Sequence, residues 1–85
     1  MDFNSSFFLT FLLEEREEML PCQPSSSLQT VFFDAISVLL NRKATLKDIK
    51  GFRIREERTE RDLDITKTVE ENGLQRGNRI RRRKS

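Results

Sequence analysis

Few side chains of this chain are suited to catalysis or to metal binding. The sequence has no histidine and a single cysteine, Cys22. A Ser-His-Asp triad, a Cys-His pair and a Cys/His zinc site are therefore excluded, as is a disulfide within the chain. We expect no enzymatic activity, no catalytic residues, no cofactor and no metal site.

Four glutamates that lie close together are the other candidates for chemistry: they are Glu14, Glu15, Glu17 and Glu18. Paired carboxylates can exchange protons with a substrate or hold a cation. Contiguous acids at the tip of a hairpin are usually solvated instead, and no histidine is present to activate Cys22. We interpret the glutamates as a solvated turn and Cys22 as a small buried or edge residue.

Arginines at a spacing of two residues occur in two segments, and they are Arg53, Arg55, Arg79, Arg81 and Arg83. Side chains two residues apart in a strand point to the same face of a sheet. A guanidinium group binds carboxylates and phosphates in a planar, bidentate manner. These five arginines are the predicted partner-binding residues.

Three interpretations of these arginines remain open. They solvate the open face of a sheet, they bind a protein partner with an acidic surface, or they bind nucleic acid. The nucleic-acid hypothesis is weakened because the chain has no Tyr or Trp on which bases would stack. It is weakened further by nearby acids at Glu56, Glu57, Glu60 and Asp62.

The elements that position these residues must fit into one small domain. A chain of 85 residues buries about two-thirds or less of its unfolded surface, which allows one core and no second domain. We expect residues 1–85 to form this domain, with 1–5 and 84–85 flexible. The apolar run 7–13 is too short to span a bilayer and lacks a preceding basic residue, so we expect a cytoplasmic protein without membrane contact.

The order of elements follows from hydrophobic spacing and from turn residues. Residues 6–24 are predicted to form a β-hairpin, with a helix over 7–20 as the alternative. Pro21 and Pro24 place its second strand at an edge. A helix near 28–41 begins after a serine cap, and strands follow near 51–55, 63–65 and 78–83. The segment 68–73 has the pattern of a capped turn, with Thr68 and Glu71 as a capping box.

Three phenylalanines, Phe7, Phe8 and Phe11, are too many for one face of the first strand. At least one is expected on the outer face, or covered by residues 1–5. An exposed phenylalanine there would indicate a protein interface or a homodimer.

Two segments within this order resemble the ubiquitin-like β-grasp family. The entry into its helix is similar to residues 24–31, PSSSLQTV, and its closing segment is similar to residues 67–77, KTVEENGLQRG. The resemblance implies an α+β fold in which a mixed sheet of four or five strands packs on one helix. It also implies that the third and fifth strands are neighbours, so that the five arginines form one surface.

The chain departs from that family in two ways that bear on function. Conjugated members end in a Gly-Gly pair, whereas this sequence ends Arg82-Arg83-Lys84-Ser85. Other members bind helical receptors through an apolar patch on the third and fifth strands, where this chain has arginines. The sequence resembles stand-alone members without the diglycine, such as the small accessory subunit of aromatic monooxygenases and the small component of type VII secretion systems.

We therefore predict a non-catalytic adaptor or accessory subunit that docks an acidic protein partner through its arginines. A nucleic-acid-binding protein that uses the same face is the alternative hypothesis. A ubiquitin-like modifier precursor is a weaker third hypothesis.

Overall fold

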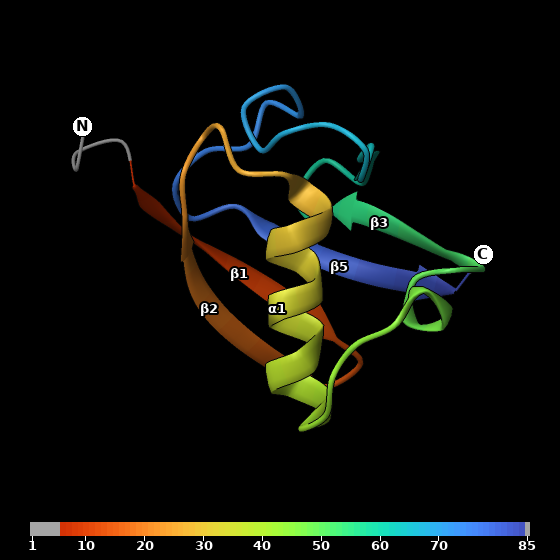
Figure 1. Ribbon diagram of the computed structural model, residues 1–85. Helices are drawn as coiled ribbons and strands as arrows, with labels where there is room; N and C mark the ends of the chain where they lie inside the picture. The colour runs from red at the N-terminus through yellow and green to blue at the C-terminus, as the bar shows by residue number, and fades with distance from the viewer. Residues whose placement is uncertain (1–5, 85) are drawn as a thin grey trace.

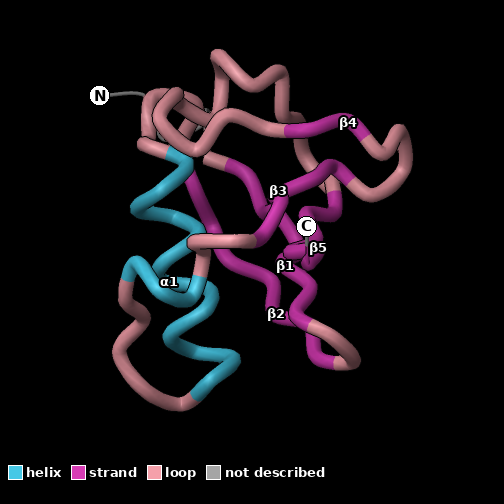
Figure 2. Tube along the Cα trace, turned by 90° about the vertical axis from the view of Figure 1, so that its right-hand side faces the viewer, coloured by secondary structure: helices cyan, strands magenta, loops and turns pink. Residues whose placement is uncertain are grey.

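A computed structural model describes residues 6–84 of the chain. Five strands form one mixed sheet in the order β2-β1-β5-β3-β4, and helix α1 crosses one face of it (Figure 1). Seen from the side, the helix and the strands form two layers (Figure 2). The predicted α+β architecture, with one helix on a mixed sheet, is confirmed.

The first two strands, β1 (Phe7–Leu13) and β2 (Arg16–Cys22), form the predicted hairpin. The helical alternative for this segment is wrong, because alternating apolar side chains bury one face of β1 against the core. β1 lies between β2 and β5, and it pairs with β5 in parallel. β2 has a neighbour on one side only, so Pro21 lies in an edge strand as predicted.

Helix α1 (Leu28–Leu40) buries the predicted stripe, namely Leu28, Val31, Phe32, Ala35 and Leu39, together with Ile36. Ser27 occupies the N-cap position, as predicted, but its side chain makes no capping hydrogen bond. Instead, the amide of Leu28 donates to the carbonyl of Lys67 at 3.0 Å. A backbone contact with a distant segment therefore replaces the local cap. The helix ends one residue before the predicted boundary, where Asn41 adopts a φ of 56°.

Strand β3 (Phe52–Glu56) lies where a strand was predicted, whereas β4 is displaced. The predicted strand 63–65 is wrong, because β4 comprises Arg61–Asp62. Leu63 and Ile65 are half-buried side chains that pack against the core from an irregular segment. The charged residues form the strand because β4 is a short edge strand, where charged side chains remain in water.

The acidic segment that begins at the end of β3 is not entirely solvated. Glu56 is 5% exposed and ends β3. Its carboxylate accepts hydrogen bonds from the amides of Arg58 and Thr59, both at 3.0 Å, and from the Thr59 hydroxyl at 2.7 Å. These donors, led by the hydroxyl, hold the pKa of Glu56 below its usual value. The carboxylate thus fixes the turn between β3 and β4.

The predicted capping box is present before β5 (Arg79–Lys84). The Thr68 amide donates to the Glu71 carboxylate at 2.9 Å, and the Glu71 amide donates to the Thr68 hydroxyl at 3.0 Å. Gly73 leaves this turn with a φ of 69°, in the left-handed region that glycine favours. Asn72 lies between Glu71 and Gly73 and is 6% exposed. Its side chain makes hydrogen bonds with the backbone of Asp64 and Thr68.

A bidentate ion pair organises the connection from α1 to β3, which contains a short 3-10 helix, Leu46–Asp48. Two Arg42 nitrogens donate to the Asp48 carboxylate at 2.7 and 3.1 Å. The Thr45 amide donates to the same carboxylate at 2.8 Å. These contacts, with Arg42 the larger influence, lower the pKa of Asp48 to about 2.

Acid is expected to destabilise the fold through Asp48. Its folded-state pKa lies below the usual aspartate value of about 3.9, so the carboxylate contributes its full stability above that pH. This contribution is lost as the pH falls toward the folded value of about 2. Urea unfolding at a series of pH values measures this loss. Between about pH 4 and pH 2, the free energy of unfolding of Asp48→Asn should depend less on pH than that of the wild type. Equal slopes for the two proteins would contradict the assignment.

The ends of the chain are described only in part. The expected flexibility of 1–5 and of Ser85 lies outside the described residues, whereas Lys84 is the last residue of β5 and pairs with Phe52. None of the helices within residues 6–84 has the length and apolar character needed to span a bilayer.

Candidate binding face

The five predicted arginines lie on the sheet face opposite α1, which we call the arginine face. Ile54 and Ile80 are buried in the core, so the residues that alternate with them along β3 and β5 point away from the helix. The antiparallel register pairs Arg53 with Arg83 and Arg55 with Arg81. Arg79 continues the row beside Thr10 of β1. The predicted juxtaposition of the third and fifth strands is therefore present.

Acidic side chains accompany most of these arginines. Arg55 Nε donates to Asp62 Oδ1 at 2.8 Å, and Arg53 Nη1 lies 3.9 Å from the other oxygen of Asp62. Arg79 Nη2 donates a hydrogen bond to Glu17 Oε2 at 2.9 Å. Each pair is exposed to water at least in part, so its contribution to stability is small. The pairs position the guanidinium groups more than they strengthen the fold.

Arg81 has two contacts at the centre of the arginine face. Its Nη2 lies 3.3 Å from Glu57 Oε2, and its Nη1 donates to the carbonyl of Glu14 at 3.2 Å. Leu12, its neighbour on β1, is buried on this face and lies outside the core cluster. Long charged side chains can cover such an apolar residue with their aliphatic portions.

The arginine face keeps a surplus of positive charge. Five guanidiniums stand against the carboxylates of Asp62, Glu17 and Glu57, which leaves two positive charges without an acidic counterpart. Within residues 6–84, the exposed side chain of Arg83 has neither an ion pair nor a hydrogen bond. The face is therefore cationic, but less so than the sequence alone indicates.

An apolar strip adjoins the arginine face on the hairpin. Phe8 is 51% exposed and Met19 is 58% exposed. Phe8 lies opposite Pro21, and Met19 lies opposite Thr10 in the next pair of the same face. The prediction that one phenylalanine of β1 faces outward is confirmed. Exposed apolar side chains beside charged ones are typical of protein-binding surfaces.

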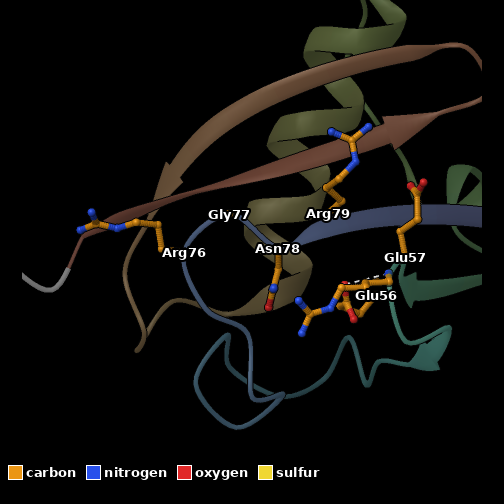
Figure 3. A pocket seen from close by; sticks show the side chains of 7 residues that line it. Glu56, Glu57, Arg76, Gly77, Asn78 and Arg79 are labelled. Atoms are coloured by element: carbon orange, nitrogen blue, oxygen red, sulfur yellow. Dashed lines mark hydrogen bonds between the residues drawn. The ribbon is translucent and has the colours of Figure 1, made fainter.

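A shallow cavity of about 380 Å³ lies where β3 ends and β5 begins (Figure 3). It is lined by Glu56, Glu57, Arg58, Arg76, Gly77, Asn78 and Arg79. Figure 3 shows the Arg79 and Glu57 side chains directed to the same side, while the Arg76 side chain extends away from them. Acids and bases are nearly balanced here, so the cavity does not favour an anion or a cation.

Of the residues that were considered for catalysis, Cys22 lies in the core and Glu17 pairs with Arg79 on the arginine face. Burial raises the pKa of the Cys22 thiol to about 11, which disfavours the reactive thiolate. Of the hairpin glutamates, Glu14, Glu15 and Glu17 are exposed. No cluster of three or more Cys, Asp or Glu side chains suited to a metal ion occurs within residues 6–84.

Sequence reasoning missed the acids that pair with the arginines. Glu17 is separated from Arg79 by 62 positions, so no local pattern links the two. Asp62 was noted as an acid near the arginines in sequence, but its position opposite Arg55 in β4 was not predicted. An acid shortly after a strand with outward arginines is the only sequence pattern that would have indicated this pair.

Comparison with solved structures supports the ubiquitin-like fold. Neither protein-family models nor curated proteins give a match to the chain. A designed protein based on ubiquitin is 13% identical, with a TM-score of 0.71 over 95% of this chain and 90% of that chain. The N-terminal ubiquitin-like domain of the 4931431F19Rik protein is 11% identical, with a TM-score of 0.65 over 95% and 76% of the two chains.

A third similar structure is ATBAG1, crystallised in complex with HSP70. It is 5% identical, with a TM-score of 0.67, and the match covers 93% of this chain and 40% of that chain. At such low identities, these likenesses describe the fold alone. The chain has a ubiquitin-like β-grasp fold.

Proposed function

We propose that this ubiquitin-like β-grasp domain is a non-catalytic protein-interaction module, an adaptor or accessory subunit, that docks a partner with an acidic surface. The observation that carries the proposal is the position of Arg53, Arg55, Arg79, Arg81 and Arg83 on one sheet face. Guanidinium groups recognise carboxylates in a bidentate manner, and arginine is enriched at protein interfaces.

The apolar strip supports a protein partner over a nucleic acid. Phe8 and Met19 offer exposed apolar surface next to the cationic row. Use of the same fold by ATBAG1, which was crystallised with HSP70, is consistent with a role in protein binding.

A titration with two probes tests the proposal directly. NMR spectra of the labelled protein are recorded with a short glutamate-rich peptide and, separately, with a single-stranded oligonucleotide. The glutamate-rich peptide is expected to shift the amides of β3 and β5. Stronger shifts with the oligonucleotide, with a steep dependence on salt, would support nucleic-acid binding and overturn the proposal. Sedimentation of the protein alone shows whether two copies associate, and a dimer whose concentration-dependent shifts fall on β3 and β5 would place a second copy on the same face.

Removing an internal competitor should strengthen binding of the acidic peptide. Asp62 lies within ion-pair distance of both Arg53 and Arg55. Asp62→Asn frees both guanidiniums, and an exposed ion pair contributes up to about 1 kcal/mol, so affinity should rise by about twofold to fivefold. Asp34→Asn is the matched control, because Asp34 is exposed on α1, which covers the other face of the sheet. An equal gain for the control would show that net charge alone governs binding.

A further inference from the structure

A second cavity, of about 370 Å³, lies at the C-terminal end of β5, and we call it the β5 pocket. It is lined by Glu14, Phe52, Arg81, Arg82, Arg83 and Lys84. β1 ends at Leu13, whereas β5 continues beyond it beside β3 as far as Lys84. Four consecutive basic residues therefore surround the free end of a central strand.

The positive charge of the β5 pocket is largely uncompensated. Arg81 is paired with Glu57, but Arg82, Arg83 and Lys84 have no carboxylate within ion-pair distance among residues 6–84. The acid that lines the pocket is Glu14. Three free cations against one carboxylate leave two positive charges. The cavity beside Arg79, with two glutamates among its lining residues, has no comparable surplus.

Arg82 gives the β5 pocket a fixed guanidinium. Its Nη1 donates to the Asp48 carbonyl at 2.6 Å, and its Cζ lies 3.9 Å above the Phe52 ring. Its Nε is buried and has no hydrogen-bond partner within the described part of the chain. A guanidinium that is already held in place loses little side-chain entropy on binding an anion. Exposed Lys84 lies two residues from Arg82 on the same side of β5, and exposed Arg83 flanks the pocket from the arginine face.

We propose that the β5 pocket binds a phosphate monoester carried by a protein partner, such as a phosphorylated side chain. A phosphoserine carries a charge of about −1.5 to −2 at neutral pH, which matches the surplus, whereas a carboxylate neutralises one charge. The inference rests on the proposed function, because it names the group on the acidic partner that the end of β5, beside the arginine face, would hold.

Three peptides that differ at one position test the inference: one carries phosphoserine, one glutamate and one serine. NMR titration should show shifts at the amides of Glu14, Arg82, Arg83 and Lys84 with the phosphoserine peptide. Its affinity should exceed that of the glutamate peptide by about tenfold, which corresponds to one additional charge-assisted hydrogen bond. Equal affinities of the phosphoserine and glutamate peptides would overturn the inference.

A pair of variants with the same change in net charge provides the control. Arg83→Gln with Lys84→Gln should reduce phosphoserine binding by about tenfold, because two of the three free cations are removed. Arg58→Gln with Arg76→Gln removes two cations at the opposite end of β5 and should leave binding unchanged. An equal loss in both variants would overturn the inference.

Failure of this inference is distinguishable from failure of the proposed function. If the glutamate and phosphoserine peptides bind equally and shift the amides of Arg53 and Arg55, the arginine face binds acidic peptides and the β5 pocket has no phosphate preference. If no acidic peptide shifts either set of amides, both proposals fail. An oligonucleotide that shifts the pocket amides at lower concentration than the phosphoserine peptide also overturns the inference, because its phosphates are diesters.

Discussion

Phe32→Ala is expected to lower the free energy of unfolding by about 3–5 kcal/mol, the usual cost of removing a buried phenylalanine ring. Phe32 is 1% exposed and lies on α1 against the sheet. Its ring centroid is 5.9 Å from that of Phe11 on β1. The substitution thus leaves a cavity between the two layers. Small domains have a total stability of about 5–15 kcal/mol, so much of it would be lost.

Urea unfolding followed by circular dichroism measures this loss. Phe8→Ala is the matched control, because Phe8 is 51% exposed and faces away from α1. The control should change the free energy of unfolding by less than about 1 kcal/mol. Similar losses for the two variants would contradict the assignment of faces along β1.

Asn72→Leu is expected to destabilise the protein by about 2–3 kcal/mol, although leucine has a similar size. The Asn72 amide group donates to the carbonyls of Asp64 and Thr68 at 2.9 and 3.0 Å. Its carbonyl accepts a bond from the Asp64 amide at 2.8 Å. Leucine supplies none of these partners. The amide and carbonyl of Asp64 therefore lose their hydrogen bonds to the side chain, and the Thr68 carbonyl keeps only its bond from the backbone amide of residue 72.

A second variant shows whether hydrogen bonds cause the effect. Asn72→Asp keeps the acceptor for the Asp64 amide but loses both donors, so it should also destabilise the fold. Asn78→Ala is the control, because the Asn78 side chain accepts one exposed hydrogen bond, from the amide of Gln75. The melting temperatures of the wild type and the three variants measure these effects, and both Asn72 variants should melt below Asn78→Ala. A wild-type melting temperature for Asn72→Leu would contradict a structural role for the amide.

Much of the fold could be predicted because its elements have periodic apolar patterns. The stripe on α1 and the alternation around Ile54 and Ile80 are local properties, and the structure buries those residues. Local patterns did not predict the features that depend on contacts between distant segments. The first amide of α1 bonds to Lys67, and β4 forms at Arg61–Asp62 because these residues lie beside β3.

The arginine face was predictable for the same reason, but its electrostatics were not. A spacing of two residues places Arg53 and Arg55 on one face of a strand, whatever the rest of the chain does. Their partner Asp62 and the pairing of Arg79 with Glu17 depend on strand order and on the position of the hairpin. The β5 pocket likewise requires that β1 ends before β5 does, which no sequence pattern shows.

Charge reversal on the arginine face should abolish binding of an acidic partner. Arg53→Glu, Arg79→Glu and Arg81→Glu are combined in one protein, and binding of the glutamate-rich peptide is compared with wild type. A control combines Lys43→Glu, Lys47→Glu and Lys50→Glu, which lie between α1 and β3 and give the same change in net charge. Our account predicts that the arginine variant loses binding, while the lysine variant keeps most of it. Retained binding in the arginine variant, or equal loss in both, would contradict it.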